Sequence, residues 1–338
     1  MRATIIEAPH RMKVGAWDTP EPLQDEVLIS VRAAGICAGD LYFYTGKNPY
    51  AIYPQVCGHE IAGVVADIGK GVTGYKPGDR VVVEPYVGCG ICYPCRIGRP
   101  NCCARLEIIG VHRAGGYAEY LVAPAVKVHK FPDNLSFTLA SFVEPIGIGV
   151  QACRRAALRP DESVLVLGCG PIGLSIVEVA RAQGARVTAV DMLQSRLDAA
   201  AKLGAKVVRA DEKFRQTILE ETRGEGPPII IEATGNPQAV EEAVDLVASG
   251  GRIVIVGLIK EGVGVKLPGL NFTRKEMTIL GSRGSEKCFP ESIELLAGGK
   301  ITYPQFATEY SMWDGPRVFD DITKNPGSVH KGVLLTGN

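Results

Sequence analysis

The chain has 338 residues, of which 46% are hydrophobic, so it is long and apolar enough for about two domains with buried cores. Its 37 basic and 37 acidic residues balance, which argues against a nucleic-acid-binding protein and against attraction to an anionic membrane surface. No apolar run reaches about 18 residues, and residues 1–7 are typical of a strand rather than of a signal peptide. Ten cysteines in such a chain predict reduced thiols and a cytoplasmic location.

Residues 1–147 have the pattern of a compact β-rich domain. Short strand-like runs are separated by Gly and Pro residues, which favour turns. The runs cover residues 26–31, 61–68, 80–83 and 117–122. We therefore expect a first domain that consists mainly of β-strands.

Residues 148–282 have a different pattern, in which apolar strands and helices alternate. The predicted helices include 171–183 and 195–203, and the predicted strands cover residues 163–167, 187–190, 206–208, 229–233, 252–256 and 277–280. Six apolar strands with helical crossovers predict an α/β fold with a doubly wound parallel sheet. Residues 283–338 return to a mixed pattern, and we expect them to fold back onto the first domain.

The most informative feature of the sequence is a C-x2-C-x2-C-x7-C cluster formed by Cys89, Cys92, Cys95 and Cys103. Four thiolates at this spacing can close a tetrahedral shell around one Zn²⁺, which leaves no position for water or substrate. Disulfides or inert buried thiols are the alternative, but regular short spacing without a secretion signal favours zinc. We predict a structural zinc site and take Cys103, rather than the adjacent Cys102, as the fourth ligand.

A second set of metal-binding residue types is dispersed through the first domain. Cys37, His59 and Glu60 offer a thiolate, an imidazole and a carboxylate, which together fit an open catalytic zinc site with three protein ligands. Glu144 stands at the expected domain junction and is a further candidate ligand. On spacing alone, Cys37 is equally well explained as a core thiol, and Glu144 as a carboxylate at a helix start.

A G-x-G-x-x-G motif follows the first predicted strand of the second domain, and its residues include Gly168, Gly170, Pro171, Ile172 and Gly173. Between a strand and a helix, such glycines permit a tight turn and let the backbone approach a pyrophosphate at the helix N-terminus. The alternative is a glycine turn that only packs the helix on the strand.

The end of the next predicted strand bears on the choice of cofactor. Asp191 lies eighteen residues after Gly173, where a carboxylate can accept hydrogen bonds from the adenosine ribose and would repel a 2′-phosphate. Arg196 lies five residues further on and would instead tolerate a phosphate. The aspartate leads us to predict NAD rather than NADP.

Taken together, these residues resemble the zinc-containing medium-chain dehydrogenase/reductase family over essentially the whole chain. The resemblance implies a β-rich GroES-like catalytic domain, a Rossmann domain that binds NAD, and one catalytic and one structural zinc per subunit. It is closest to the sorbitol and sugar-acid branch, which includes L-galactonate and L-idonate 5-dehydrogenases. The motifs that carry it are Gly35-Ile36-Cys37, Gly58-His59-Glu60, the four cysteines, Phe142-Val143-Glu144-Pro145, the glycine-rich motif, and segments 99–103 and 109–116.

The resemblance also implies roles for single residues. In this family the positions of Cys37 and His59 bind the catalytic zinc, and a carboxylate at the Glu60 or Glu144 position binds the zinc or its water. Arg283 matches an arginine near the substrate, with a surface or inter-domain salt bridge as the alternative. Subunits pair through the region of residues 253–280, which implies a homodimer or homotetramer. The positions that line the nicotinamide are Val256, Gly257, Leu258, Ser282 and Arg283.

The sequence departs from the family at the proton relay. The family usually has Ser or Thr two residues after the zinc-binding cysteine and often His five residues after it, whereas this chain has Gly39 and Tyr42. A water, Tyr42, Tyr44, Glu60 or a hydroxyl of the substrate would have to carry the proton instead.

The sequence therefore predicts an enzyme that oxidises a secondary alcohol of a polyol or sugar acid with NAD. Zinc would lower the pKa of the substrate hydroxyl, and the cofactor would accept the hydride. A carboxylate on the substrate could pair with Lys47, Arg113 or Arg283. Two alternatives stay open: an L-threonine-type amino-alcohol dehydrogenase, and a noncatalytic NAD- and zinc-binding redox sensor.

Overall fold

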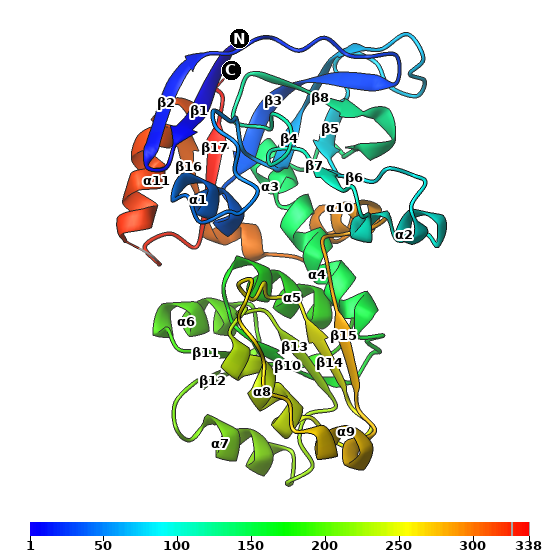
Figure 1. Cartoon of the computed structure of the whole chain (residues 1–338), viewed down its shortest axis with the longest axis vertical. Helices are drawn as coiled ribbons and strands as arrows, with labels where there is room; N and C mark the ends of the chain where they lie inside the picture. Colours follow the sequence, from blue (N-terminus) through cyan, green and yellow to red (C-terminus); the bar gives the residue numbers. More distant parts are fainter. Residues whose placement is uncertain (326, 338) are drawn as a thin grey trace. The chain divides into compact units, whose positions relative to one another are not determined.

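The computed structural model describes residues 1–325 and 327–337, and the chain divides into two compact units (Figure 1). Unit 1 comprises Met1–Glu144, Ser285–Gly299 and Pro304–Asn338. Unit 2 comprises Pro145–Gly284 and Lys300–Tyr303. Each unit has its own sheet, and the two are described separately below.

Unit 1 is built around a mixed sheet with the strand order β16-β17-β3-β4-β5-β9, to which β8 adds by pairing with β3. The central strands β3 and β4 are rich in Val, Ile and Ala, and these apolar side chains form much of the core. The strands of this sheet are β3 (Glu26–Gly35), β4 (Glu60–Ile68), β5 (Arg80–Val83), β8 (Tyr120–Pro124), β9 (Val128–Lys130), β16 (Ala307–Ser311) and β17 (Lys331–Leu335).

Two smaller sheets and several short helices complete unit 1. The sheets are the hairpin of β1 (Arg2–Ala8) with β2 (Arg11–Ala16) and the pair of β6 (Tyr86–Val87) with β7 (Glu107–Ile108). The helices are α1 (Ala38–Tyr44), α2 (Tyr93–Arg96), α3 (Phe137–Ser141), α10 (Phe289–Ala297) and α11 (Gly315–Lys324). Short 3₁₀ turns lie at Pro100–Cys102, Ala125–Lys127 and Met312–Asp314. Helix α4 (Val143–Arg155) begins in unit 1 and continues into unit 2.

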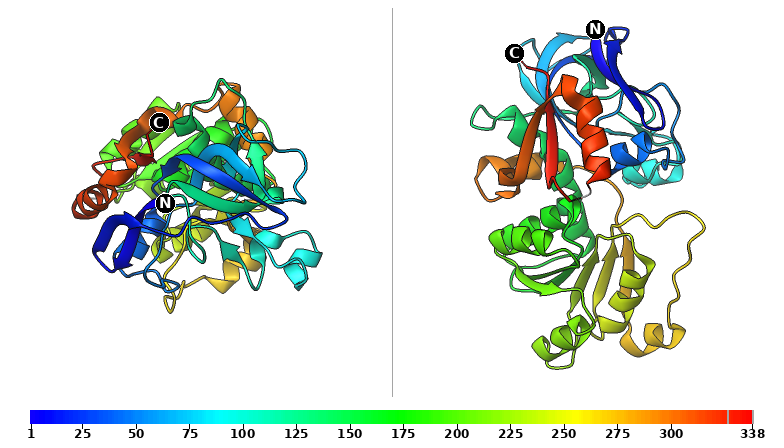
Figure 2. Two further views of the ribbon diagram at one scale, coloured as in Figure 1. Left: turned by 90° about the horizontal axis from the view of Figure 1, so that it is seen from above. Right: turned by 90° about the vertical axis from the view of Figure 1, so that its left-hand side faces the viewer.

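Unit 2 is a six-stranded sheet with the order β12-β11-β10-β13-β14-β15, and all five strand pairs are parallel. Helices lie on both sides of it (Figure 2). The α/β fold with a doubly wound parallel sheet, predicted from the sequence, is thus confirmed. The elements are β10 (Ser163–Leu167), α5 (Pro171–Ala182), β11 (Arg186–Asp191), α6 (Gln194–Lys202), β12 (Lys206–Arg209), α7 (Phe214–Glu221), β13 (Ile229–Glu232), α8 (Pro237–Leu246), β14 (Arg252–Ile255), α9 (Gly269–Lys275), β15 (Thr278–Gly281) and the start of the 3₁₀ turn Tyr303–Phe306.

The C-terminal part of the chain differs from the expectation at two points. Most of it belongs to unit 1, but Arg283 and Gly284 belong to unit 2, and so does the separate segment Lys300–Tyr303. The buried carboxylate of Glu178 explains the second point, because it accepts hydrogen bonds from the backbone N–H groups of Thr302 at 2.8 Å and Tyr303 at 2.6 Å. A buried carboxylate needs such donors, and this segment supplies them.

The region 253–280, through which subunits are expected to pair, contains most of β14 and most of β15. Between these strands lie residues 256–268 without regular secondary structure and helix α9. Gly262, Gly264 and Pro268 interrupt any strand pattern there, and Pro268 stands immediately before α9. Strand β15 is the edge of the sheet.

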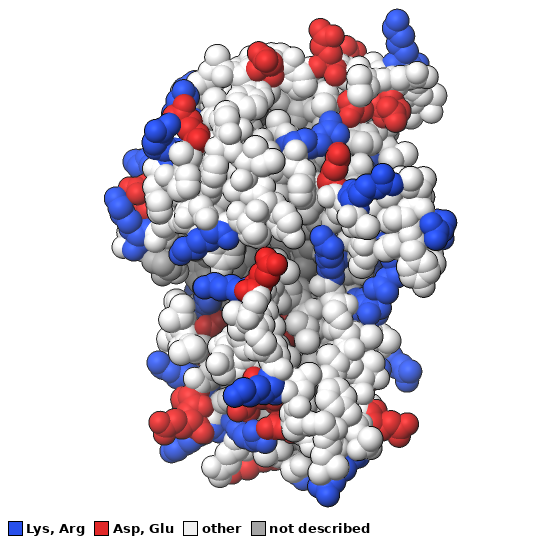
Figure 3. Space-filling view, in the orientation of Figure 1, with Lys and Arg blue, Asp and Glu red and all other residues white. Residues whose placement is uncertain are grey.

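No helix among residues 1–325 and 327–337 is long and apolar enough to cross a membrane. Acidic and basic side chains both occur on the visible face of each unit (Figure 3), in agreement with the balanced charge of the sequence.

Candidate metal centres and cofactor site

The four cysteines predicted to bind a structural zinc lie together in unit 1. Their sulfur atoms are all within 4.8 Å of one another, and Cys92 Sγ is 3.5 Å from Cys95 Sγ and 3.6 Å from Cys103 Sγ. A tetrahedral Zn²⁺ with Zn–S bonds of about 2.3 Å needs sulfur atoms about 3.8 Å apart, so the cluster fits the ion. Cys102 is outside this group, which agrees with the choice of Cys103 as the fourth ligand.

Local backbone geometry holds this cluster together. The N–H group of Cys89 donates to Cys103 Sγ at 3.2 Å, and hydrogen bonds from the N–H groups of Ile91 and Cys92 lower the pKa of Cys89 to about 6. A Cβ atom at Gly88 would lie 2.8 Å from Pro100 Cβ, so only glycine lets the two ends of the loop approach so closely. The first feature favours a thiolate at Cys89 and the second a tight loop, and a closed zinc site requires both.

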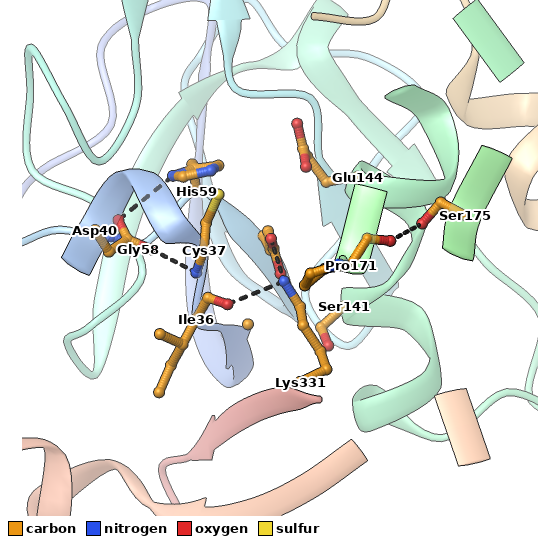
Figure 4. A network of polar contacts seen from close by, with 12 residues as sticks. Ile36, Cys37, Asp40, Gly58, His59, Ser141, Glu144, Pro171, Ser175 and Lys331 are labelled. Atoms are coloured by element: carbon orange, nitrogen blue, oxygen red, sulfur yellow. Dashed lines mark hydrogen bonds and ion pairs between the residues drawn. The ribbon is translucent and has the colours of Figure 1, made fainter. Parts of the chain in front are cut away.

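The second metal cluster lies in unit 1 at the ends of two central strands. One candidate ligand atom each from Cys37, His59 and Glu60 lies within 4.8 Å of the others. Cys37 follows β3, Glu60 begins β4, and the pairing of Gly35 with Glu60 in the antiparallel ladder brings the two strand ends together. Figure 4 shows the sulfur of Cys37 directed toward the ring of His59. The donor set of thiolate, imidazole and carboxylate fits Zn²⁺ with room for a further ligand.

A buried carboxylate that the sequence analysis missed supports this cluster. Asp40 Oδ2 accepts hydrogen bonds from the N–H of Cys37 at 2.9 Å and from the hydroxyl of Tyr117 at 2.8 Å. Asp40 Oδ1 faces His59 Nδ1 at 3.5 Å (Figure 4), which is long for a hydrogen bond, so this contact is mainly electrostatic. A carboxylate behind a histidine ring is the arrangement that orients metal-binding imidazoles.

Electrostatics within this group favour the charged forms. Burial alone would raise the pKa of Asp40, but His59 and the donors around it outweigh burial and hold the pKa below its usual value. Burial likewise opposes protonation of His59, yet Asp40 and Cys37 raise the pKa of the imidazole well above its usual range. Asp40 and Cys37 thus create a negative potential at the imidazole, which a proton or a bound metal cation would compensate.

Lys331 is a second residue that the sequence analysis missed. Its ammonium pairs with Glu60 Oε1 and donates to the carbonyl oxygen of Ile36 at 3.0 Å (Figure 4). Burial would lower the pKa of Lys331, but the charge of Glu60 outweighs burial and raises it. The signal in the sequence was weak, because Lys331 lies 271 residues from Glu60 and reaches it only through the pairing of β17 with β3.

Glu144 lies outside the three-residue cluster. It is buried near the start of α4, and Tyr86 donates a hydrogen bond of 2.9 Å to its Oε1. Burial raises the pKa of Glu144 to about 7, and Glu60 adds to the shift against the opposing effect of His59. The structure therefore brings together Cys37, His59 and Glu60, whereas Glu144 is held by a tyrosine of β6.

The position of the missing relay residue faces the same cluster. A Cβ atom at Gly39 would lie 3.9 Å from both Cys37 Sγ and His59 Cε1, which is ordinary van der Waals distance. Two tyrosines were considered as substitutes for the missing proton relay. Tyr42 is 55% exposed, whereas Tyr44 is buried, and its ring centroid lies 5.7 Å from that of Phe319. Tyr44 therefore points into the core of unit 1 and does not qualify as a relay.

Arg113 and His112, two neighbouring residues of the segment 109–116, have partners within unit 1. Arg113 forms an ion pair of 2.9 Å with the buried Glu26, so its charge is already matched within unit 1. His112 Nδ1 accepts a hydrogen bond from the N–H of Ile108 at 3.0 Å, and its ring lies 5.9 Å from that of Tyr50. His112 is thus a hydrogen-bonded histidine in a loop of unit 1.

In unit 2, the glycine-rich motif forms the turn between β10 and α5. Gly168 has φ +96°, and a Cβ at Gly173 would overlap the carbonyl oxygen of Gly168. Gly170, in contrast, has no atom within 4 Å of its Cβ position, and Pro171 begins the helix. The turn thus requires two glycines for its own packing, and at Gly170 it leaves open space next to a helix N-terminus, as a pyrophosphate requires.

Asp191 ends β11 next to this turn. Its Oδ2 accepts a hydrogen bond from the N–H of Cys169 at 2.8 Å, and its Oδ1 accepts one from the N–H of Leu193 at 2.9 Å. The guanidinium of Arg196 lies 3.6 Å from the same carboxylate. The side chain is therefore fixed at the carboxyl edge of the sheet, where doubly wound folds bind the ribose.

The other predicted cofactor positions follow β14 and β15 at the same edge. Ser282 and Arg283 come directly after β15, and the N–H of Ser282 donates to the carbonyl of Ile255 at 2.9 Å. Leu258 is 92% exposed. Because the carboxyl ends of parallel strands share one edge, these residues lie along the edge that also carries the glycine-rich motif. The residues that follow β14 are Val256, Gly257 and Leu258.

Glu232 at the end of β13 was also missed. It is fully buried, and its Oε1 accepts hydrogen bonds from the N–H groups of Thr234 at 2.6 Å and Gly235 at 3.0 Å. A Cβ at Gly257 would lie 2.8 Å from its Oε2. Glu232 therefore fixes the turn after β13. The backbone of this turn explains the glycine after β14, because a Cβ at Gly257 would lie only 2.0 Å from the nitrogen of Gly235.

Comparison with known proteins agrees with both units. The model of the alcohol dehydrogenase GroES-like domain matches residues 23–133, and that of the zinc-binding dehydrogenase matches residues 171–298. The chain belongs to the zinc-containing medium-chain dehydrogenase/reductase family. The predicted GroES-like and Rossmann folds are thereby confirmed.

Individual relatives cover nearly the whole chain. The starvation-sensing protein RspB of Escherichia coli K12 is 37% identical over 96% of this chain and 95% of its own length. The L-galactonate-5-dehydrogenase of the same strain is 36% identical, with 99% and 98% covered. A crystal structure titled as a short chain alcohol dehydrogenase (rspB) from E. coli CFT073, complexed with NADH, has a TM-score of 0.92 at 33% identity, with 99% of both chains covered. The chain is thus a dehydrogenase of the zinc-type alcohol and polyol group, whose cofactors are zinc and NAD(P).

Proposed function

We propose that this protein oxidises a secondary alcohol of a polyol or sugar acid, with NAD as the hydride acceptor. The observation that carries the proposal is the cluster of Cys37, His59 and Glu60 with unfilled space at Gly39. The similarity to an L-galactonate-5-dehydrogenase supports a polyhydroxylated substrate.

The chain's own residues would do the following. Cys37 and His59 would hold the catalytic zinc, Asp40 would orient the imidazole, and Glu60 and Glu144 would provide carboxylates beside it. Zinc bound there supplies Lewis-acid polarisation of the alcohol oxygen, and NAD accepts the hydride. Cys89, Cys92, Cys95 and Cys103 would hold a second, structural zinc.

The preference for NAD over NADP rests on Asp191. Its carboxylate is fixed by two backbone N–H groups, so it cannot easily move away from an incoming 2′-phosphate. Arg196 already faces that carboxylate, which reduces its ability to attract a phosphate. Both contacts support NAD.

We also infer that the protein works as a homodimer or homotetramer in the cytoplasm. Strand β15 is an edge strand, and the segment before it exposes several large apolar side chains, a combination that favours pairing with another copy. The cysteine quartet and Cys37, all free thiols, support a reducing compartment. The exposed apolar residues are Leu258, Val263, Leu267, Leu270 and Phe272. Light scattering at micromolar concentration should give at least twice the 36.1 kDa chain mass, and a monomer would contradict the assembly.

A substrate screen tests the proposed activity. Zinc-loaded protein is incubated with NAD or NADP and with polyols, aldonates, inositols and amino alcohols, and the formation of NADH or NADPH is followed by absorbance. We expect turnover of a polyol or aldonate with NAD, and none with the Cys37→Ser control. Preference for an amino alcohol would favour a threonine-type dehydrogenase. Cofactor binding without turnover of any secondary alcohol would favour a noncatalytic sensor.

A further inference from the structure

A buried ion pair lies directly beside the candidate catalytic zinc site. Lys331 is 3% exposed and Glu60 is 1% exposed, and the lysine ammonium contacts Glu60 Oε1. Buried ion pairs are costly to form, because both charges lose their hydration. A lysine placed against a candidate metal ligand therefore calls for a functional explanation.

The carboxylate of Glu60 lies in a small site on three adjacent strands, between Gly35 and Lys331, which we call the seat. Gly35 on β3 pairs with Glu60 on β4 and with Val333 on β17, the strand that also carries Lys331. A Cβ at Gly35 would overlap Glu60 Oε2, so the absence of a side chain there makes space for the carboxylate. This oxygen is buried and has no hydrogen-bond partner. The seat thus binds one oxygen of Glu60 and leaves the other unsatisfied.

The lysine is itself fixed in place. Its ammonium also donates to the carbonyl oxygen of Ile36 at 3.0 Å, one residue before Cys37. It can therefore hold Glu60 at a constant position next to the metal cluster. In this position a carboxylate oxygen of Glu60 is still within 4.8 Å of the candidate ligand atoms of Cys37 and His59.

We propose that Lys331 is a positioning residue that retains Glu60 in this seat and competes with the bound metal for its carboxylate. Two cations would then share the carboxylate of Glu60. One is a metal ion at Cys37 and His59, and the other is the ammonium of Lys331. The competition weakens the bond between Glu60 and the metal and keeps a coordination position accessible to the alcohol. This inference rests on the proposed zinc centre but not on the identity of the substrate.

The test is a spectroscopic double-mutant cycle. Protein is loaded with Co²⁺, whose visible bands report its ligands, and the bands that disappear in Cys37→Ser are assigned to this site. The spectra of wild type, Lys331→Met, Glu60→Gln and the double variant are compared. Lys127→Met is the matched control, because Lys127 also forms a mostly buried ion pair in unit 1, with Glu84 at 2.8 Å.

We expect Lys331→Met to shift the Cys37-dependent bands, because Glu60 then turns fully to the metal. In the Glu60→Gln background the same substitution should leave these bands unchanged, and Lys127→Met should have no effect. Zinc release to a chelator should slow by about tenfold in Lys331→Met, within the range known for partners of metal ligands. Lys331→Arg, which keeps the charge, should resemble wild type.

Several results would overturn the proposal. Unchanged bands in Lys331→Met, an equal shift with and without Glu60, or faster zinc release would each show that Lys331 does not compete for this carboxylate. If Lys331→Met does not fold, Lys331→Gln tests the same prediction, because it removes the charge but keeps a hydrogen-bond donor for the carbonyl oxygen of Ile36. A wild-type protein without any Cys37-dependent band would remove the zinc centre itself, whereas failure of the substrate screen alone would leave the Lys331 result unaffected.

Discussion

The two cysteine-containing metal clusters of unit 1 are built in opposite ways. The structural candidate takes all four ligands from fifteen consecutive residues, and nearby backbone N–H groups support the sulfur atoms. The catalytic candidate takes Cys37 from just after β3 and the pair His59 and Glu60 from the start of β4, and its supporting residues extend to Lys331. The first is a local loop closed by its metal, whereas the second is part of the core of the unit.

This difference has an energetic consequence. A loop rich in glycine and with few buried side chains gains its order from the metal, so loss of the metal should unfold it. The catalytic cluster is instead anchored by buried residues such as Asp40 and Tyr117, whose hydrogen bonds persist without an ion. The same metal should therefore stabilise the fold in one place and serve chemistry in the other.

The largest expected effect is on stability. Cys95→Ser should lower the melting temperature by about 10 °C or more, since structural zinc sites contribute several kcal/mol to folding. Elemental analysis should find about two zinc ions per wild-type chain and about one per variant chain. Cys37→Ser is the matched control, and it should lose activity and its zinc while the melting temperature changes little. Equal melting of Cys95→Ser and wild type would refute the structural role.

The contrast between the clusters also explains what the sequence could predict. The cysteine quartet has a local spacing rule, and the glycine-rich turn has a fixed context between strand and helix, so both were found from the sequence. The parallel sheet of unit 2 followed from the alternation of apolar strands and helices. The catalytic ligands were grouped mainly through the resemblance to a family, because no spacing rule joins Cys37 to His59.

The residues that the sequence analysis missed were missed for one physical reason. Asp40, Lys331 and Glu232 act through buried contacts that depend on helix α1 and on the pairing of distant strands. A charged residue in a sequence gives no sign of whether it will be buried. The suggestion that Tyr44 carries the proton failed for the same reason, since only the packing shows that its ring belongs to the core.

The second prediction tests the support of the catalytic cluster. Asp40→Asn preserves the shape of the side chain but removes the charge that faces His59 and one acceptor for backbone or tyrosine donors. Zinc affinity at this site should fall between about tenfold and a hundredfold, as is usual for residues that orient metal ligands. Competition with a chelator measures it. Zinc retention by the cysteine quartet is the internal control, and a loss from both sites would point to general unfolding instead.

The third prediction concerns unit 2. Asp191→Gly removes the carboxylate next to the glycine-rich turn, and NAD affinity should fall by about tenfold to a hundredfold, the value of hydrogen bonds to a charged group. Binding of NADP should improve relative to NAD. Fluorescence titrations with the reduced forms of both dinucleotides measure the two dissociation constants. If the wild type used NADP with the same kcat/KM as NAD, the assignment of Asp191 would be wrong.

The smallest expected effect is at Gly39, where the catalytic cluster departs from its family. A Cβ there would contact Cys37 Sγ and His59 Cε1 at 3.9 Å, which is ordinary van der Waals distance, so Gly39→Ala and Gly39→Ser should fold normally. The side chain would occupy space beside the metal ligands that the protein leaves unfilled. Both variants should therefore raise KM by up to about tenfold, the lower end of the effect of one carbon in a binding pocket, with kcat little changed.

The pair of variants separates the two explanations for the missing hydroxyl. Alanine adds only volume, whereas serine adds volume and a group that can pass a proton from the alcohol to solvent. If Gly39 exists to make room for the substrate, the two variants behave alike in kcat and KM from pH 6 to 10. If the chain instead lacks a relay that it could use, Gly39→Ser alone raises kcat and changes its pH dependence, and the interpretation of Gly39 as substrate space must be abandoned.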